Sequence, residues 1–163
     1  MNPRPGVFHK LVHRLLMSRP VSAFMARVLY RADAALLRLT KSRHTFTGFA
    51  GLPVTQLTTI GAKTGQPRTL PLMAVIDREK IALIASNFGR KHHPAWYYNL
   101  KAHPECKLQL NGMTETCLAH EAEGDEYERY WQLALSYYAG YEKYRVRAGR
   151  RIPVLVLEPK ERS

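Results

Sequence analysis

Residues 61–69 bring together, in one short connection, side chains that could bind an anion. Two glycines, a lysine, an arginine and hydroxyl residues lie here between apolar runs at 54–59 and 70–76, whose composition is typical of strands. Glycine lets a loop approach a ligand, Lys63 and Arg68 supply positive charge, and free backbone N–H groups can cradle an anion. This combination predicts a site for a phosphate-bearing ligand. The loop matches neither the Walker A pattern nor the G-x-G-x-x-G fingerprint, and an ordinary hairpin turn is the alternative.

A second set of candidate residues is aromatic, in the tyrosine-rich stretch 137–146. If this stretch is mostly helical, Tyr138, Tyr141 and Tyr144 share one side, because each step of three residues shifts the side chain by only about 60°. Three phenols on one side form an apolar wall with polar tips, which suits a flat ligand; core packing is the alternative. Ser86 ends an apolar run and could bring a hydroxyl to a ligand ring, although an ordinary strand end has the same composition.

Other chemistries lack the residue spacing that they need. The seven histidines include the adjacent pair His92 and His93, but no H-E-x-x-H pattern or Cys/His cluster, so no metal site is predicted. A G-x-S-x-G nucleophile elbow is absent as well. The aromatic residues do not interleave with the basic ones as a platform for single strands requires, so no nucleic-acid partner is predicted. Cys106 and Cys117 match no disulfide framework and are predicted to be reduced thiols.

The elements that must position these residues are mostly strands. Hydrophobic runs separated by turn residues predict strands at 54–60, 69–77, 80–86, 106–111, 113–121 and 152–157. Helices are predicted at 95–102, after Pro94, and from 125 to about 138, where Asp125 and Glu128 resemble a capping box. Pro153 suggests that the last strand begins at an edge. Because no long helical crossover separates consecutive strands, we predict an α+β fold with antiparallel pairing, in a small barrel or a strongly bent sheet.

The N-terminal segment, residues 1–45, differs from the predicted domain at 46–163. The chain carries a formal net charge of +12, and residues 1–44 hold nine lysines and arginines against one acidic residue. Apolar residues recur there at helical spacing, which predicts basic amphipathic helices. Such helices could bind an anionic membrane surface, or they could pack on the domain with solvated arginines. Without a secretory signal or an apolar span of transmembrane length, the chain is predicted to be cytoplasmic, with a peripheral position at the inner face of the membrane as one option.

Four sequence patterns, taken together, resemble one enzyme family. They are G-x-K-[ST]-G-x-x-R from Gly61, A-S-N-x-G from Ala85, H-P-x-W-Y-x-N-L from His93, and R-x-I-P-V-x-V-L-E-P from Arg150. In this order and spacing they resemble the nitroreductase and quinone reductase family that depends on the deazaflavin coenzyme F420. The similarity runs from about Leu57 to Pro159.

The resemblance implies a split β-barrel like that of flavin-mononucleotide-binding oxidoreductases, and hydride transfer from the reduced coenzyme to a quinone, a nitroaromatic or a similar planar acceptor. The residues that it implies for the coenzyme phosphate are Ala62, Lys63, Thr64 and Arg68. Those implied along the side chain and ring of the coenzyme are Thr69, Leu70, Pro71, Leu72, Met73, Ile84, Ala85, Ser86, Asn87, Ala95, Trp96, Tyr97, Tyr98, Asn99 and Tyr141. Ser86, Tyr138, Tyr141 and Tyr144 are implied at the reacting side.

Two departures from the family pattern bear on the ligand. Asn87 and Phe88 follow Ala85-Ser86 where a basic residue or a second glycine is common, and Met73 stands where an aromatic residue is common. Two alternatives to a deazaflavin enzyme therefore remain: a related barrel that binds flavin mononucleotide (FMN) or haem, and a deazaflavin carrier without catalytic activity.

Overall fold

The computed structural model describes residues 53–160. The predicted N-terminal segment, residues 1–45, lies outside this range, as do residues 46–52 and 161–163. The amphipathic helices predicted in that segment, and the domain boundary near residue 45, therefore stay predictions.

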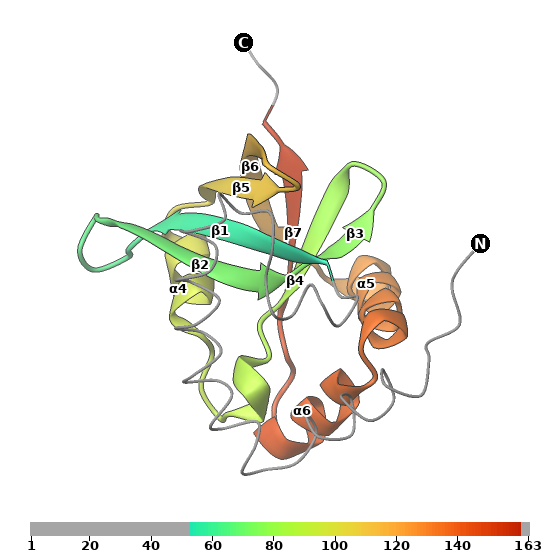
Figure 1. The fold of residues 1–163 in the computed structure, drawn as a ribbon. Coiled ribbons are helices and arrows are strands. Elements are labelled where there is room, and N and C mark those ends of the chain that lie inside the picture. Colours follow the sequence, from blue (N-terminus) through green and yellow to red (C-terminus); the bar gives the residue numbers. More distant parts are fainter. Residues whose placement is uncertain (1–52, 161–163) are drawn as a thin grey trace.

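The described chain forms one sheet of seven antiparallel strands (Figure 1), in the order β2-β1-β5-β6-β7-β4-β3. The strands are β1 (Val54–Ile60), β2 (Pro67–Met73), β3 (Val75–Asp77), β4 (Lys80–Ile84), β5 (Glu105–Leu110), β6 (Met113–Glu121) and β7 (Val154–Pro159). A turn at Asn111 and Gly112 joins β5 to β6, and both residues have the positive φ that this turn requires. The predicted antiparallel α+β arrangement is confirmed.

The prediction of one continuous strand over 69–77 was wrong. The chain divides at Ala74, which is completely buried and donates its N–H to the Pro53 carbonyl at 2.9 Å. The break is needed because β2 and β3, although consecutive in sequence, form opposite edges of the sheet. The chain must cross from one edge to the other at this point, and the sheet curls around the crossing. The edge position also explains why β2 tolerates prolines, which cannot donate to a neighbouring strand.

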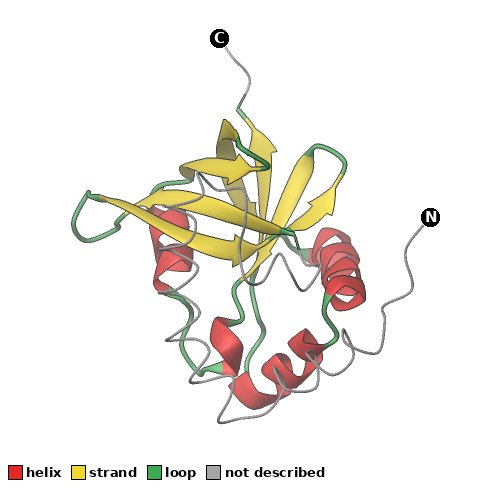
Figure 2. Ribbon diagram, in the orientation of Figure 1, coloured by secondary structure: helices red, strands yellow, loops and turns green. Residues whose placement is uncertain are grey.

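Three α-helices and one 3-10 turn accompany the sheet: η1 (Asn87–Gly89), α4 (Ala95–Ala102), α5 (Gly124–Tyr137) and α6 (Gly140–Ala148). Figure 2 shows α4 beside the β1–β2 hairpin, α5 on the opposite side beside β3, and α6 below the sheet next to η1. The predicted helix at 95–102 is confirmed, and the one predicted from 125 is confirmed to within one residue. The predicted capping box is wrong, because Glu123 occupies the N-cap of α5 without a side-chain hydrogen bond to the helix.

The position predicted for the last strand was also wrong. β7 lies in the middle of the sheet, between β6 and β4, and Pro153 precedes it rather than marking an edge. The Pro153 carbonyl accepts the N–H of Ala85 at 2.9 Å. Pro153 thus needs no N–H of its own here, and its carbonyl connects the start of β7 to the end of β4. The residues that follow β4 are candidate site residues, so this central strand supports them directly.

Two groups of buried side chains hold the sheet and the helices together. One joins the sheet to α5 and α6 and includes Trp131, which is completely buried, and Ile152. The other joins the sheet to α4 and includes Leu57 and Trp96. Burying a single side chain of this kind contributes about 1.5–3 kcal/mol to stability. The helices that carry the candidate site residues are therefore attached to the sheet by its core.

The predicted free thiols are confirmed for both cysteines. Cys106 on β5 and Cys117 on β6 are buried and unlinked, and they lie opposite each other in the strand register. Burial raises the pKa of Cys106 to about 12 and that of Cys117 to about 11. The protonated thiols therefore act as small core side chains rather than as nucleophiles.

Candidate functional site

The predicted anion-binding loop connects β1 to β2 and projects from the edge of the sheet (Figure 1). The side chains of Lys63 and Thr64 in the loop, and of Arg68 at the start of β2, are exposed. Gly61 is needed for the tight turn, since a Cβ there would lie 2.6 Å from Oγ1 of Thr64. The loop therefore presents two cations and a hydroxyl to solvent at one end of β2.

The backbone of this loop is less available to a ligand than the sequence predicted. The N–H groups of Gly61, Thr64 and Gly65 donate to carbonyls within the loop at 2.8–3.2 Å. The N–H of Gln66 donates to Oγ1 of Thr64 at 3.3 Å. These four N–H groups are therefore not free for an anion, because the loop uses them to hold its own shape. Binding of an anion would depend mainly on the exposed cationic side chains.

Asn99 connects α4 to this loop from inside the protein. Its Oδ1 accepts the N–H of Ala62 at 3.0 Å, and its Nδ2 donates to Oγ1 of Thr59, also at 3.0 Å. Thr59 is completely buried and Asn99 is 9% exposed, so both bonds are shielded from water. Sequence reasoning placed Asn99 at the coenzyme edge, whereas the structure shows its amide holding the loop.

β2 leads from the loop toward the aromatic end of the domain. Thr69, next to the loop, shares a hydrogen bond of 2.9 Å with Thr58 through their hydroxyls. Leu70 and Leu72 pack against the core group under α4, and Met73 packs against the group that contains the tyrosines. Seven residues of strand span about 20 Å at 3.3 Å per residue. An elongated ligand along β2, past Pro71, could reach both the basic loop and the tyrosines.

The segment after β4 was also predicted to border the coenzyme. Ile84, Ala85 and Ser86 are all buried, with Ser86 8% exposed. The side chain of Asn87 reaches forward along the chain, and its Nδ2 donates to the carbonyl of His92 at 3.1 Å. The segment therefore offers Ser86 at the end of β4, while the Asn87 amide is used within the loop.

The predicted α4 residues face in different directions. Ala95 and Tyr98 are exposed, whereas Trp96 is 5% exposed and packs in the core. The Tyr97 hydroxyl donates to Oε2 of Glu121 at 3.0 Å, and burial together with this bond raises the pKa of Tyr97 to about 12. α4 thus brings only part of the predicted set to the surface. The Trp96 side chain supports the sheet from the inside.

Tyr138, Tyr141 and Tyr144 form one buried cluster, but not on one side of a single helix as predicted, because Tyr138 is extended between α5 and α6. Their ring centroids lie 5.5–6.2 Å apart, and each residue is 6% exposed. The hydroxyls of Tyr138 and Tyr144 lie 3.3 Å apart. Burial raises the pKa of all three phenols, so they are neutral hydrogen-bond donors at neutral pH. The cluster can donate a hydrogen bond or a proton but cannot supply a phenolate.

Gly140 is a site residue whose role sequence reasoning missed. Tyr138 ends α5 in an extended conformation, and α6 then begins at Gly140. A Cβ at Gly140 would lie 2.2 Å from Cζ of Tyr138. The ring of Tyr138 therefore occupies the space that a side chain at position 140 would need. The sequence pattern does not show this role, because the approach of the ring depends on how α5 ends.

The segment after β4 and the tyrosine cluster meet in the structure. The Phe88 ring lies 6.2 Å from the Tyr144 ring in an edge-to-face arrangement. η1 and α6 are in contact, and a Cβ at Gly89 would lie 3.0 Å from the Tyr144 carbonyl oxygen. The structure thus brings together three of the predicted parts: the end of β4, the tyrosine cluster and, through Met73, the end of β2.

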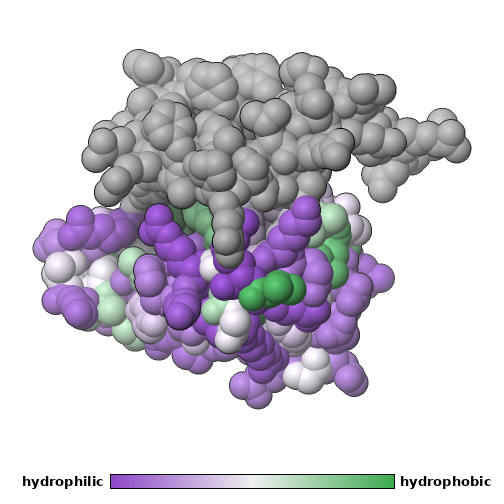
Figure 3. Space-filling model, turned by 90° about the horizontal axis from the view of Figure 1, so that it is seen from below, coloured by the Kyte–Doolittle hydropathy of each residue, from purple (hydrophilic) through white to green (hydrophobic). Residues whose placement is uncertain are grey.

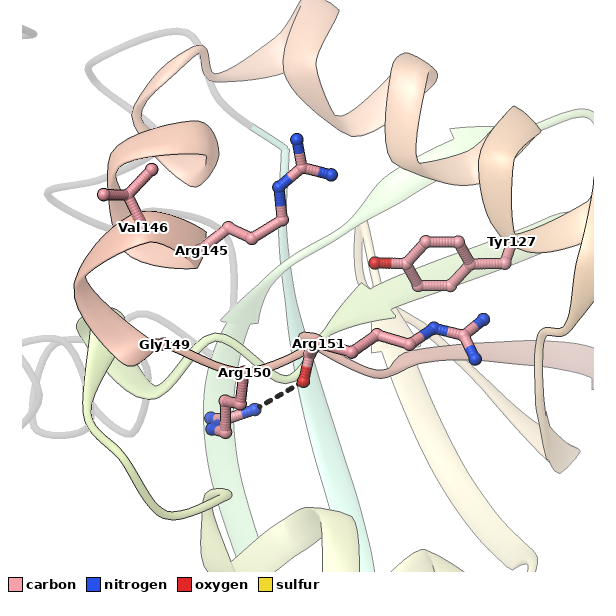
Figure 4. A pocket seen from close by; sticks show the side chains of 6 residues that line it. All are labelled: Tyr127, Arg145, Val146, Gly149, Arg150 and Arg151. Atoms are coloured by element: carbon pink, nitrogen blue, oxygen red, sulfur yellow. Dashed lines mark hydrogen bonds between the residues drawn. The ribbon is translucent and has the colours of Figure 1, made fainter.

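Other features of the described residues lie apart from this site. An open hollow of about 510 Å³ is lined by Tyr127, Arg145, Val146, Gly149, Arg150 and Arg151 (Figure 4), none of which was predicted to bind the coenzyme. The face of the domain shown in Figure 3 is mostly hydrophilic where it is coloured. Within residues 53–160, no three His, Cys, Asp or Glu side chains gather closely enough to hold a metal ion. No helix in that range has the length and apolar character to cross a membrane.

Comparisons with known proteins agree with the resemblance in the sequence. A family model described as F420H(2)-dependent quinone reductase matches residues 29–159. A Mycobacterium tuberculosis protein named F420H(2)-dependent quinone reductase is 34% identical over 148 residues, which cover 86% of this chain and 97% of that protein.

Solved structures also support the predicted fold. A structure described as an F420-H2 dependent reductase is 40% identical, with a TM-score of 0.61, and the match covers 65% of this chain and 94% of that one. A heme binding protein from Mycobacterium smegmatis is 18% identical with a TM-score of 0.53, over 69% of this chain and 48% of that one, which shows similarity of fold alone. The predicted split-barrel class is confirmed.

Proposed function

The chain belongs to the F420H(2)-dependent quinone reductase family, and from this premise we propose that it transfers a hydride from reduced coenzyme F420 to a quinone or a similar planar acceptor. One observation supports the assignment to this site: β2, about 20 Å long, runs from the exposed basic loop to Met73, which packs against the buried group that contains the three neutral phenols. This arrangement suits a ligand with an anionic tail and a flat reactive ring.

The basic end fits the anionic part of the coenzyme. Lys63 lies in the loop and Arg68 just after it, at the start of β2, and their exposed positions allow a phosphate to approach without a buried charge being left unpaired. Arg68 can bind phosphate oxygens through two N–H groups at once, and Lys63 acts as a point charge. Asn99 holds the loop in place from α4. The loop thus supplies affinity and orientation, and it takes no part in the chemistry.

The tyrosine end fits the reacting part. When bound, the coenzyme supplies the hydride, so the protein has to place donor and acceptor, exclude water and provide a proton. The neutral hydroxyls of Tyr138 and Tyr144 can donate to the oxygen of an acceptor as it is reduced. Ser86 offers a further hydroxyl at the end of β4. Each of these groups is uncharged at neutral pH, which suits an apolar acceptor.

Titration of the purified full-length protein with oxidised coenzyme F420 and, separately, with FMN tests the assignment. We expect the coenzyme fluorescence to report binding of F420 that is tighter than binding of FMN. Mixing reduced coenzyme with menadione should then accelerate coenzyme oxidation in the presence of catalytic amounts of protein. Preferred binding of FMN would support the flavin alternative, and binding without turnover would support a carrier. Absence of F420 binding would refute the proposal.

For the position in the cell, we propose a cytoplasmic enzyme that binds the inner face of the membrane through residues 1–44. The excess of basic residues in that segment supports this proposal, because each contributes about 1 kcal/mol near an anionic surface. Full-length protein should co-sediment with vesicles rich in phosphatidylserine at low salt and should be released at high salt. If the protein does not bind such vesicles at low salt, the membrane proposal is refuted, and the alternative that the segment packs on the domain remains.

A further inference from the structure

The segment between β4 and α4 adopts a backbone conformation that needs external support. Asn87, Phe88 and Gly89 follow one another with φ values of 47°, 56° and 76°. Left-handed conformations are sparsely populated by residues that have a Cβ, and two such residues in a row persist only where the surroundings hold them. Because this segment starts with Ser86, its shape decides where that hydroxyl lies.

Arg150, which follows α6, supplies that support through backbone carbonyls. Its Nη2 donates to the carbonyls of Ala85 and His92 at 3.3 and 3.2 Å, and its Nε donates to that of Arg90 at 3.3 Å. A fourth bond, from Nη1 to the carbonyl of Arg151 at 3.1 Å, orients the guanidinium relative to the segment between α6 and β7 that carries it (Figure 4). One planar group therefore binds both ends of the segment.

Only arginine has the shape for this task. Its guanidinium offers five N–H donors in a fixed plane, so it can reach three carbonyls of one segment and one of another at the same time. A lysine would keep the charge but offers a single ammonium that cannot span the same positions. Arg147 adds one bond from α6, from Nη1 to the Phe88 carbonyl at 3.3 Å. The left-handed turn is thus attached to the helix that carries Tyr141 and Tyr144.

We propose that Arg150 is a positioning residue that fixes residues 85–92 relative to the tyrosine cluster, so that Ser86 meets the coenzyme ring in the reactive arrangement. Arg150 acts through the backbone of this segment and touches neither coenzyme nor acceptor. The proposal rests on the proposed function insofar as Ser86 borders the coenzyme. The link between the arginine and the segment is a property of the protein alone and can be measured without any ligand.

The test compares Arg150→Lys and Arg150→Ala with Arg151→Lys. Arg151 is the adjacent arginine, and its guanidinium lies over the Tyr127 ring at 4.0 Å instead of binding the segment. Hydrogen exchange should become faster at the backbone amides of 85–92 in both Arg150 variants and stay unchanged elsewhere in the domain. The kcat for menadione reduction should fall about ten- to a hundredfold, as expected when at least one charge-assisted hydrogen bond is lost. The Arg151 variant should resemble wild type in both measurements.

Chemical rescue separates positioning from general stability. Free guanidinium, added well below denaturing concentration, should restore part of the kcat of Arg150→Ala and part of the protection of 85–92, without effect on the Arg151 variant. If Arg150→Ala does not fold, the exchange pattern and kcat of Arg150→Lys carry the test. Unchanged exchange at 85–92 in the folded variants, or faster exchange spread over the whole domain, would overturn the proposal. If the wild-type protein lacks quinone reductase activity, the proposed function fails. The role of Arg150 is then still tested by two measurements, hydrogen exchange at 85–92 and affinity for the oxidised coenzyme.

Discussion

The two ends of the candidate site differ in almost every physical property. The basic end, residues 62–68, is exposed and charged, and the shape of its loop comes from hydrogen bonds between near neighbours and from Asn99. The tyrosine cluster is buried and neutral, and its shape comes from the packing of α5 against α6. A charged, exposed site binds through interactions that salt weakens, whereas a buried one depends on volume and on shielded hydrogen bonds. Affinity and turnover should therefore respond to different mutations.

The largest expected effect is on affinity, at the basic end. Arg68→Ala should weaken binding of oxidised coenzyme by about 1.5–3 kcal/mol, the contribution of hydrogen bonds to charged groups, and the loss should shrink as salt is raised. Fluorescence titration at two salt concentrations measures both effects. Arg78→Asn is the control: it removes an arginine from another hairpin, and asparagine tolerates the positive φ there. Equal losses in the two variants would indicate a general charge effect instead of a phosphate site.

At the tyrosine end, adding a side chain at Gly140 should lower the free energy of unfolding. Alanine normally favours a helix over glycine by up to about 1 kcal/mol, so Gly140→Ala would stabilise α6 if space allowed. The approach of the Tyr138 ring predicts the opposite sign, a loss of about 1–3 kcal/mol from overpacking. Denaturant unfolding measures the difference. Combining Gly140→Ala with Tyr138→Ala should remove most of the penalty, and additive losses in the double variant would contradict the clash.

Loss of one hydroxyl should separate turnover from binding. Tyr138→Phe keeps the ring but removes a possible donor to the acceptor, so kcat should fall by up to about tenfold with coenzyme affinity nearly unchanged, in line with about 0.5–1.5 kcal/mol for a neutral hydrogen bond. Rates of menadione reduction at saturating substrate measure this effect. Tyr137→Phe is the matched control, since the Tyr137 hydroxyl donates to the Ile76 carbonyl at 3.3 Å, outside the cluster. Equal rates in wild type and Tyr138→Phe would restrict Tyr138 to packing.

The same contrast explains what could be predicted from the sequence. The bounds of β1, β6 and α4 follow from local periodicity, and the turn at 111–112 follows from its own two residues. The use of the Ala62 N–H by Asn99 could not be predicted, because the partners are 37 positions apart. The four carbonyls bound by Arg150 carry no sequence signal, since every residue has a carbonyl.

The break at Ala74 shows a further limit of sequence patterns. Residues 69–77 have the composition of one strand, and only the closure of the sheet requires the chain to leave one edge for the other. The role of Gly140 is similar, since its lack of a side chain matters only once α5 has ended at Tyr137. Patterns therefore located the site residues along the chain, whereas packing between distant segments decides which atoms of those residues face a ligand.

The last prediction concerns the pH dependence of stability, which should be small near neutral pH and tests whether the buried groups are neutral in the intact protein. Burial raises the folded-state pKa of Tyr138, Tyr141, Tyr144 and both cysteines above their unfolded values. The unfolded state then releases protons first, so the contribution of these five groups to stability is constant below about pH 8.5 and decreases at higher pH as unfolded cysteines and then tyrosines ionise. Melting temperatures between neutral pH and the alkaline range should show this decrease. Cys106→Ala should make the decrease in melting temperature begin less steeply, because one raised pKa is removed.

The kcat should not decline through phenol ionisation below about pH 10, the ordinary pKa of tyrosine. A phenolate signal in the ultraviolet spectrum of the folded protein near neutral pH would contradict the neutral donors on which the proposed proton supply depends.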